Sequence, residues 1–115
     1  CHNVADVKAY IKDPACGFPF TNQGYSDLYD GMKELGRLKH FRSQHPVPVL
    51  FVNGQDDPCS GTNSQIAASS NALKSAGYRD LTSKIYQGMR HEILFEKNGA
   101  VVEQDIVKWL DQRFA

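Results

Sequence analysis

The chain has 115 residues, enough for a single domain with a modest hydrophobic core. Hydrophobic residues make up 41% of it and charged residues 23%, as in ordinary globular proteins. Its 13 basic residues balance its 13 acidic ones, so charge gives no reason to expect nucleic acid or an anionic membrane as a partner. No apolar run approaches the roughly 20 residues that span a bilayer, and neither a signal peptide nor a lipidation motif is visible.

The three cysteines, Cys1, Cys16 and Cys59, are odd in number and show no C-x-x-C spacing. This pattern argues against a disulfide framework or a structural zinc site and predicts a reducing, cytoplasmic location. The chain opens with Cys1 instead of methionine, and "CHNVADV" resembles the interior of a longer sequence. We therefore expect the chain to be a fragment.

The first part of the chain predicts a helix followed by an apolar loop. A short helix is expected within residues 3–14, where Asn3 can cap the first turn and a proline ends it. Residues 15–24 have no helical or strand pattern. Exposing Phe18 and Phe20 of this loop to solvent would be unfavourable, so we expect them either to pack in a core or to line a pocket.

The rest of the chain alternates between helix and strand patterns. A second helix is predicted over residues 25–41, and the nearly unbroken apolar run within 46–54 predicts a strand buried on both faces. An amphipathic helix over 62–78, a more alternating strand over 81–88 and a helix over 100–114 follow. This alternation predicts an α/β fold with parallel strands and right-handed crossovers.

Polar side chains follow both predicted strands. The loop "GQDDPCSG" (54–61) follows the first and "GMRHEILFE" (88–96) follows the second. In open α/β sheets, chemistry gathers in the loops at the carboxyl ends of the strands, and neighbouring strand ends lie about 5 Å apart. An aspartate that accepts from one imidazole nitrogen fixes the tautomer and leaves the other nitrogen free as a base. The order aspartate then histidine is that of an α/β-hydrolase, in which the serine comes first.

These motifs resemble the C-terminal part of a serine hydrolase. Within the α/β-hydrolases the chain is most similar to the serine aminopeptidase, monoacylglycerol lipase and lysophospholipase group. Those proteins have a G-x-x-D-P loop after the seventh strand and a G-x-R-H-E loop after the eighth, matched here by "GQDDP" and "GMRHE". The segment "YIKDPACGFPFTNQGYSDL" also resembles the end of their cap and the helix that returns to the core.

The resemblance implies a role for each matching residue. Asp57 matches the catalytic acid and His91 the general base, with Asp56 as the alternative acid, since only the motif separates the two aspartates. Glu92 and Glu96 match positions that are often acidic in the group, and we expect them to be structural.

The sequence departs from the family pattern: it contains no G-x-S-x-G nucleophile elbow, and the oxyanion-hole segment and the first strands of the sheet are missing as well. Cys59 is an alternative thiol nucleophile for His91, although a small residue packed beside the site is the favoured interpretation. "HEILF" is not a zinc motif, because H-E-x-x-H requires a second histidine where Phe95 stands. Neither a metal nor another cofactor is therefore predicted.

The resemblance also implies a domain plan and a function. Residues 1–45 are expected to form the end of the cap and the returning helix, and residues 46–115 the C-terminal βαβα segment of the core, without the N-terminal part of the sheet. The expected function is hydrolysis of a lysophospholipid, monoacylglycerol or small ester through a Ser-Asp-His triad whose serine lies outside this chain. Phe18 and Phe20 are candidate substrate-binding residues. The alternative is a non-catalytic fragment or interaction module.

Two expectations concern the isolated chain. Without an activated serine it should not hydrolyse esters. In the family the strand within residues 46–54 lies inside the sheet, so its open edge here should pair with a second copy and give a homo-oligomer.

Overall fold

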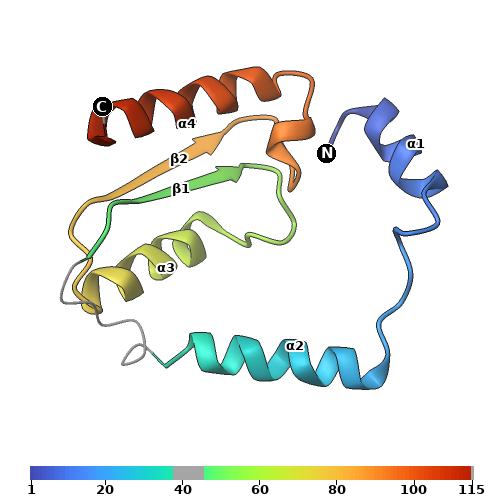
Figure 1. Ribbon diagram of the computed structural model, residues 1–115, viewed down its shortest axis with the longest axis horizontal. Helices are drawn as coiled ribbons and strands as arrows, with labels where there is room; N and C mark the ends of the chain where they lie inside the picture. The colour runs from blue at the N-terminus through green and yellow to red at the C-terminus, as the bar shows by residue number, and fades with distance from the viewer. Residues whose placement is uncertain (38–45, 115) are drawn as a thin grey trace. The chain divides into compact units, whose positions relative to one another are not determined.

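The computed structural model describes residues 1–37 and 46–114. Figure 1 shows the elements in chain order: α1 (Val4–Lys12), α2 (Asn22–Leu35), β1 (Val49–Gly54), α3 (Asn63–Ser75), β2 (Leu81–Tyr86), the 3₁₀ turn η2 (Ile93–Phe95) and α4 (Gly99–Phe114). No helix in these two ranges is both long enough and apolar enough to cross a membrane.

The chain separates into two compact units. Unit 1 comprises Cys1–Cys16, Val52–Gly61 and Lys84–Ala115, and unit 2 comprises Gly17–Phe51 and Thr62–Ser83. Both loops that carry the sequence motifs belong to unit 1.

Strands β1 and β2 form a parallel pair, which confirms the predicted α/β class. The Val49 N–H donates to the Asp80 carbonyl and the Gln55 N–H to the Tyr86 carbonyl, both at 2.9 Å. The two bonds have the same offset in sequence and the same direction, so the strands are parallel and in one register. Strand β1 is half-buried and only Gly54 is fully buried. The prediction of burial on both faces was therefore wrong, because the sheet has only these two strands over the described residues.

The predicted helices form, with both boundaries of α2 corrected. The Asn3 side chain caps α1 by accepting the Ala5 N–H at 3.3 Å, as the sequence indicated. Helix α2 begins at Asn22, earlier than predicted, because the Thr21 hydroxyl accepts the Gly24 N–H at 3.1 Å and caps it there. It ends at Leu35, before Gly36, so it is shorter than the predicted 25–41. Residues 38–41 of that prediction lie outside the described residues.

The later elements agree with the sequence patterns. Helix α3 begins after Thr62, whose N–H donates to the Gln65 side chain at 2.8 Å in a capping box. Beyond its end, Gly77 has a φ of +106°, a conformation that favours glycine. Strand β2 has three exposed positions out of six, consistent with its expected place near a sheet edge.

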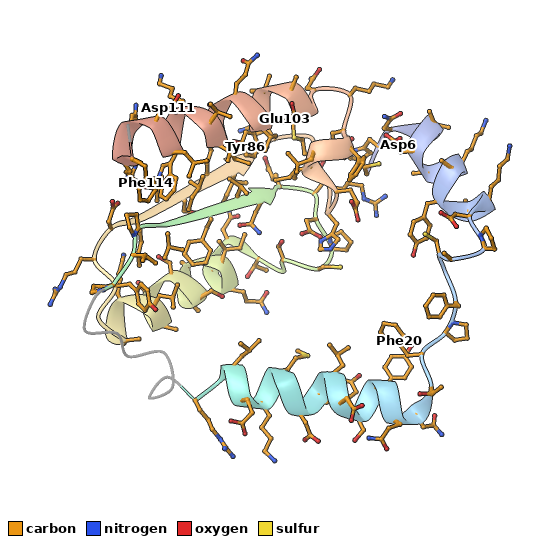
Figure 2. The ribbon with its side chains drawn as sticks, viewed as in Figure 1. Asp6, Phe20, Tyr86, Glu103, Asp111 and Phe114 are labelled. Atoms are coloured by element: carbon orange, nitrogen blue, oxygen red, sulfur yellow. The ribbon has the colours of Figure 1, made fainter. Side chains whose placement is uncertain are left out.

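The hydrophobic core of unit 1 lies beside the end of β2. Tyr86, Met89, Ile93 and Val102 form it, and Val102 is fully buried. In Figure 2, Tyr86 lies on β2 next to α4. Its hydroxyl donates to Asp105 of α4 at 3.0 Å. Burial, and then this bond to the carboxylate, raise the pKa of Tyr86 to about 12. The core therefore holds β2, η2 and α4 together and frames the loop that carries His91.

The start of α4 requires a glycine. A Cβ on Gly99 would lie 2.2 Å from the Leu94 carbonyl oxygen, too close for any real contact. We therefore expect Gly99→Ala to lower the free energy of unfolding by at least about 1 kcal/mol, because neither backbone segment can move without disturbing the core. Urea unfolding of the gene product measures this change.

Gly31→Ala is the matched control. Gly31 lies in the interior of α2, and a Cβ there would meet nothing within 4 Å. Alanine should stabilise this helix by about 0.5–1 kcal/mol. A Gly99→Ala variant as stable as wild type would contradict the close approach at α4.

Candidate active site

The two motif loops meet at the carboxyl ends of the strands. The Asp56 N–H, after β1, donates to the Met89 carbonyl, after β2, at 2.9 Å. Gly54 permits this approach, because a Cβ there would lie 2.3 Å from the carbonyl oxygens of both Met89 and Arg90. The glycine of "GQDDP" is thus required because the neighbouring loop occupies the space that a side chain would need.

This contact brings Asp57 and His91 together. The Nδ1 atom of His91 lies 3.1 Å from Oδ2 of Asp57. Asp57 is buried, with 7% of its surface exposed, whereas the His91 side chain is 60% exposed. The pair therefore joins a buried carboxylate to an imidazole that solvent can reach.

Two further donors hold Asp57, and one of them, Ser60, itself accepts a hydrogen bond. The Cys59 N–H donates to Oδ1 at 2.8 Å, the Ser60 hydroxyl donates to Oδ2, and the Asn53 amide donates to the Ser60 oxygen at 3.0 Å. Burial raises the pKa of Asp57, but the hydrogen bonds from Ser60, His91 and Cys59 together outweigh it and lower the pKa to about 2. Asp57 is accordingly ionised at neutral pH.

An ionised Asp57 decides the tautomer of His91. A carboxylate can only accept, so the Nδ1 of a neutral His91 must carry the proton in the bond to Asp57. The Nε2 atom then has a free lone pair, and none of the described residues donates a hydrogen bond to it. An exposed imidazole oriented in this way can accept a proton from a nucleophile.

The geometry separates the two aspartates that the sequence motif left open. Asp57 bonds His91, whereas Asp56 is exposed and joins the neighbouring loop through its backbone. Cys59 is also exposed, with a free thiol. Neither Ser60 nor Asn53 was identified from the sequence, although a serine three residues after an aspartate in a proline-containing turn is a usable signal.

The aromatic residues proposed for substrate binding belong to unit 2. Phe18 and Phe20 are 63% and 52% exposed. Their rings pack edge to face with centroids 6.4 Å apart, and Phe20 (Figure 2) packs in the same way on Tyr25 at 5.5 Å. Their role in substrate binding stays a prediction.

Comparison with known families is decisive for the fold and the group. The family model described as serine aminopeptidase, S33, matches residues 1–98, which is most of the chain. The chain belongs to this family of α/β-hydrolases. Its two parallel strands and flanking helices correspond to the C-terminal portion of that fold.

A solved structure supports the same assignment. The chain is similar to the monoacylglycerol lipase of Paleococcus ferrophilus, with a TM-score of 0.69 and 25% sequence identity. The match covers 95% of this chain and 40% of the lipase, so the chain spans less than half the length of that enzyme. No curated protein matched the sequence.

Beside the candidate site, Glu96 supports the loop that carries His91. Glu96 is buried, and it accepts the Arg90 N–H at 3.0 Å and the His2 N–H at 2.8 and 2.9 Å. Burial raises the pKa of Glu96, but the two N–H donors outweigh it and leave the pKa below its usual value. Glu92 is exposed. The expectation of a structural role therefore has a visible basis at Glu96.

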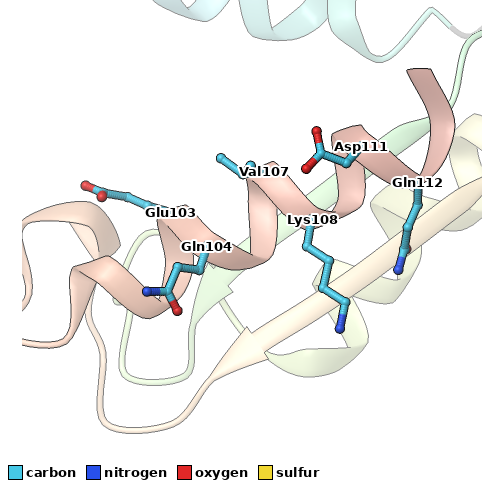
Figure 3. Close-up of a pocket in the computed structure, with 6 residues that line it drawn as sticks. All are labelled: Glu103, Gln104, Val107, Lys108, Asp111 and Gln112. Atoms are coloured by element: carbon cyan, nitrogen blue, oxygen red, sulfur yellow. The ribbon is translucent and has the colours of Figure 1, made fainter. Parts of the chain in front are cut away.

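Two of the surface hollows formed by the described residues lie in unit 1, and the residues that line them do not include Asp57 or His91. One of about 550 Å³ runs along α4 and is shown in Figure 3, lined by Glu103, Gln104, Val107, Lys108, Asp111 and Gln112. All six residues come from one helix, so among the described residues no polar groups from different elements converge there. A smaller hollow of about 210 Å³ borders the His91 loop at Gln87–Met89 and includes Glu96. Geometry, not hollow size, therefore identifies the candidate site.

The low pKa of Asp57 predicts an acid-dependent stability. Its folded pKa of about 2 lies below the ordinary value of 3.8, so its stabilising contribution is complete above the ordinary value and is lost as the pH falls through about 2.

Ser60→Ala removes one donor and should move the pKa of Asp57 upward, toward 3.8. A carboxyl NMR titration measures this pKa. Ser64→Ala, which removes a hydroxyl bonded to Thr62, is the control, and an unchanged pKa in Ser60→Ala would refute the role of this bond.

Glu96→Ala should destabilise the protein by about 2 kcal/mol, because it leaves two backbone N–H groups without their acceptor. Glu92→Ala, from the same loop but exposed, should change stability by less than about 0.5 kcal/mol. Denaturant unfolding of both variants makes the comparison. Equal losses of stability in the two variants would mean that the hydrogen bonds of Glu96 do not stabilise the loop.

Proposed function

We propose that the chain is the C-terminal part of a serine hydrolase that acts on carboxylic esters such as a lysophospholipid, a monoacylglycerol or a small ester. Asp57 and His91 supply the acid and the base of a Ser-Asp-His triad, and the serine lies outside this chain. The observation that carries the proposal is the buried, ionised Asp57 bonded to Nδ1 of an exposed His91. Membership of the serine aminopeptidase family and similarity to a monoacylglycerol lipase support it.

The proposed chemistry follows from the two nitrogens of His91. Nε2 takes the proton of the serine hydroxyl as that oxygen attacks the ester carbonyl, and returns it to the alcohol that leaves. Water then hydrolyses the acyl-enzyme by the same route. Asp57 stays ionised throughout, holds the ring in orientation and stabilises the imidazolium that forms twice in each cycle.

The domain plan and the location belong to the same proposal. Residues 1–45 represent the end of the cap and the helix that returns from it, and residues 46–115 the βαβα end of the core. Phe18 and Phe20, exposed on the first of these segments, would contact the acyl chain of the substrate. The three cysteines are free thiols, which fits a cytoplasmic enzyme.

Substitutions in the gene product test the triad. His91→Ala should abolish ester hydrolysis, and Asp57→Asn should lower kcat by about 10⁴, the loss seen when the equivalent serine-protease carboxylate is changed and the imidazole tautomer is no longer fixed. Asp56→Asn is the matched control and should have a mild effect, because Asp56 is exposed and its backbone bond is retained. Steady-state rates with p-nitrophenyl butyrate give the comparison.

Labelling by a fluorophosphonate separates the hydrolase from a non-catalytic module. The gene product should be labelled, and His91→Ala should slow the labelling because the serine loses its base. Absent labelling, or equal losses of kcat in Asp56→Asn and Asp57→Asn, would contradict the proposed assignment.

We further propose that the isolated 115-residue chain self-associates through β1. Successive N–H groups along a strand point to opposite edges. Because the N–H groups of Val49 and Gln55 donate toward β2, those of Leu50 and Val52 lie on the edge away from β2. Such an open edge pairs with a second copy. Light scattering across a dilution series should show a dimer that Leu50→Pro weakens, since proline removes a donor from that edge alone. A compact monomer at micromolar concentration would refute this.

A further inference from the structure

A second set of donors is present at the candidate active site. Ligand atoms of Asp57, Cys59 and His91 all lie within 4.8 Å of one another. Hydrolysis by the proposed triad uses the carboxylate and the imidazole, and the Cys59 thiol has no part in it. The thiol is free and exposed, and it comes from the same turn that holds Asp57.

The three donors are of the kinds that zinc prefers. A thiolate, an imidazole nitrogen and a carboxylate oxygen are the usual protein ligands of Zn²⁺, and three of them leave a fourth tetrahedral position for water. Mg²⁺ and Ca²⁺ take oxygen ligands and do not select a thiolate. The donor set therefore favours Zn²⁺ over the hard divalent cations.

Two of the three ligands are already fixed in place. Asp57 is buried and held by the Cys59 N–H and the Ser60 hydroxyl, and His91 is held by Asp57. Only the Cys59 side chain has to move to close the donors around an ion, and its exposure leaves it free to rotate. Such pre-organisation lowers the cost of ordering the ligands on binding.

From this geometry we infer that Asp57, Cys59 and His91 form an inhibitory Zn²⁺ site. An ion on Nδ1 replaces the proton that joins His91 to Asp57. The remaining proton of the neutral ring is then on Nε2, so His91 has no free lone pair and cannot take a proton. The metal site stands independently of the proposed function, and only its inhibitory effect rests on that function.

Binding of zinc is measured first, with no substrate. The gene product and its variants are titrated with Zn²⁺ by calorimetry, and with Co²⁺ to detect charge-transfer absorption from a thiolate ligand. Cys59→Ser and His91→Asn should each weaken zinc binding at this site at least about tenfold, since even the loss of a residue behind a ligand costs about 10–100-fold. Cys59→Ser should also abolish the charge-transfer band.

Cys16→Ser and His2→Asn are the matched controls, because they remove the same donor types elsewhere, and both should bind zinc as wild type does. Cys59 and His91 are exposed, so their variants should fold, which circular dichroism verifies. A loss smaller than tenfold in either Cys59→Ser or His91→Asn overturns the site.

Inhibition is measured second. Zn²⁺ should suppress ester hydrolysis by wild type, and Cys59→Ser should require at least about tenfold more zinc for the same fractional loss, each rate being normalised to that variant's own metal-free rate. Equal sensitivity of the two proteins overturns the inhibitory role. A gene product that binds zinc through these residues but hydrolyses no ester would refute the proposed function and leave the metal site standing.

Discussion

The close approach of two loops at Gly54 is the constraint on which the candidate site depends. The carbonyl oxygens of Met89 and Arg90 occupy the space in which any side chain at position 54 would lie. The parallel register of β1 and β2 brings both loops to the same edge, and the Asp56–Met89 hydrogen bond joins them. His91, the next residue after Arg90, is placed beside Asp57 as a consequence.

Electrostatics then determines what the pair can do. A buried carboxylate without partners would take up a proton, but Ser60, His91 and the Cys59 N–H keep Asp57 ionised. Because that charge fixes the proton of His91 on Nδ1, the exposed Nε2 is left as an acceptor. The loop that carries His91 is also held by Glu96, a second buried carboxylate, which accepts the backbone N–H groups of Arg90 and His2. Each loop is thus positioned by a buried carboxylate that accepts several hydrogen bonds, Asp57 in the first loop and Glu96 in the second.

Much of this arrangement could be predicted from the sequence, because its signals are local. Helix caps such as Asn3, the apolar run of β1 and the two glycine-led motifs each depend on a few neighbouring residues. The early start of α2 was missed because the cap at Thr21 lies in a stretch that resembled a loop. The bond between Glu96 and His2 has no local signal, since the two residues are 94 positions apart. Likewise, only the motif distinguishes the adjacent aspartates in the sequence, whereas in the structure Asp57 is buried and bonded to His91 and Asp56 is exposed.

The candidate site depends on an ionised Asp57 that orients His91 with its proton on Nδ1. Nitrogen NMR of the His91 ring in the neutral state tests this orientation most directly, because the shifts of protonated and bare ring nitrogens differ. We expect a protonated Nδ1 and a bare Nε2, with the preference lost in Asp57→Asn and kept in Asp56→Asn. A ring protonated on Nε2, or one indifferent to Asp57→Asn, would contradict this expectation.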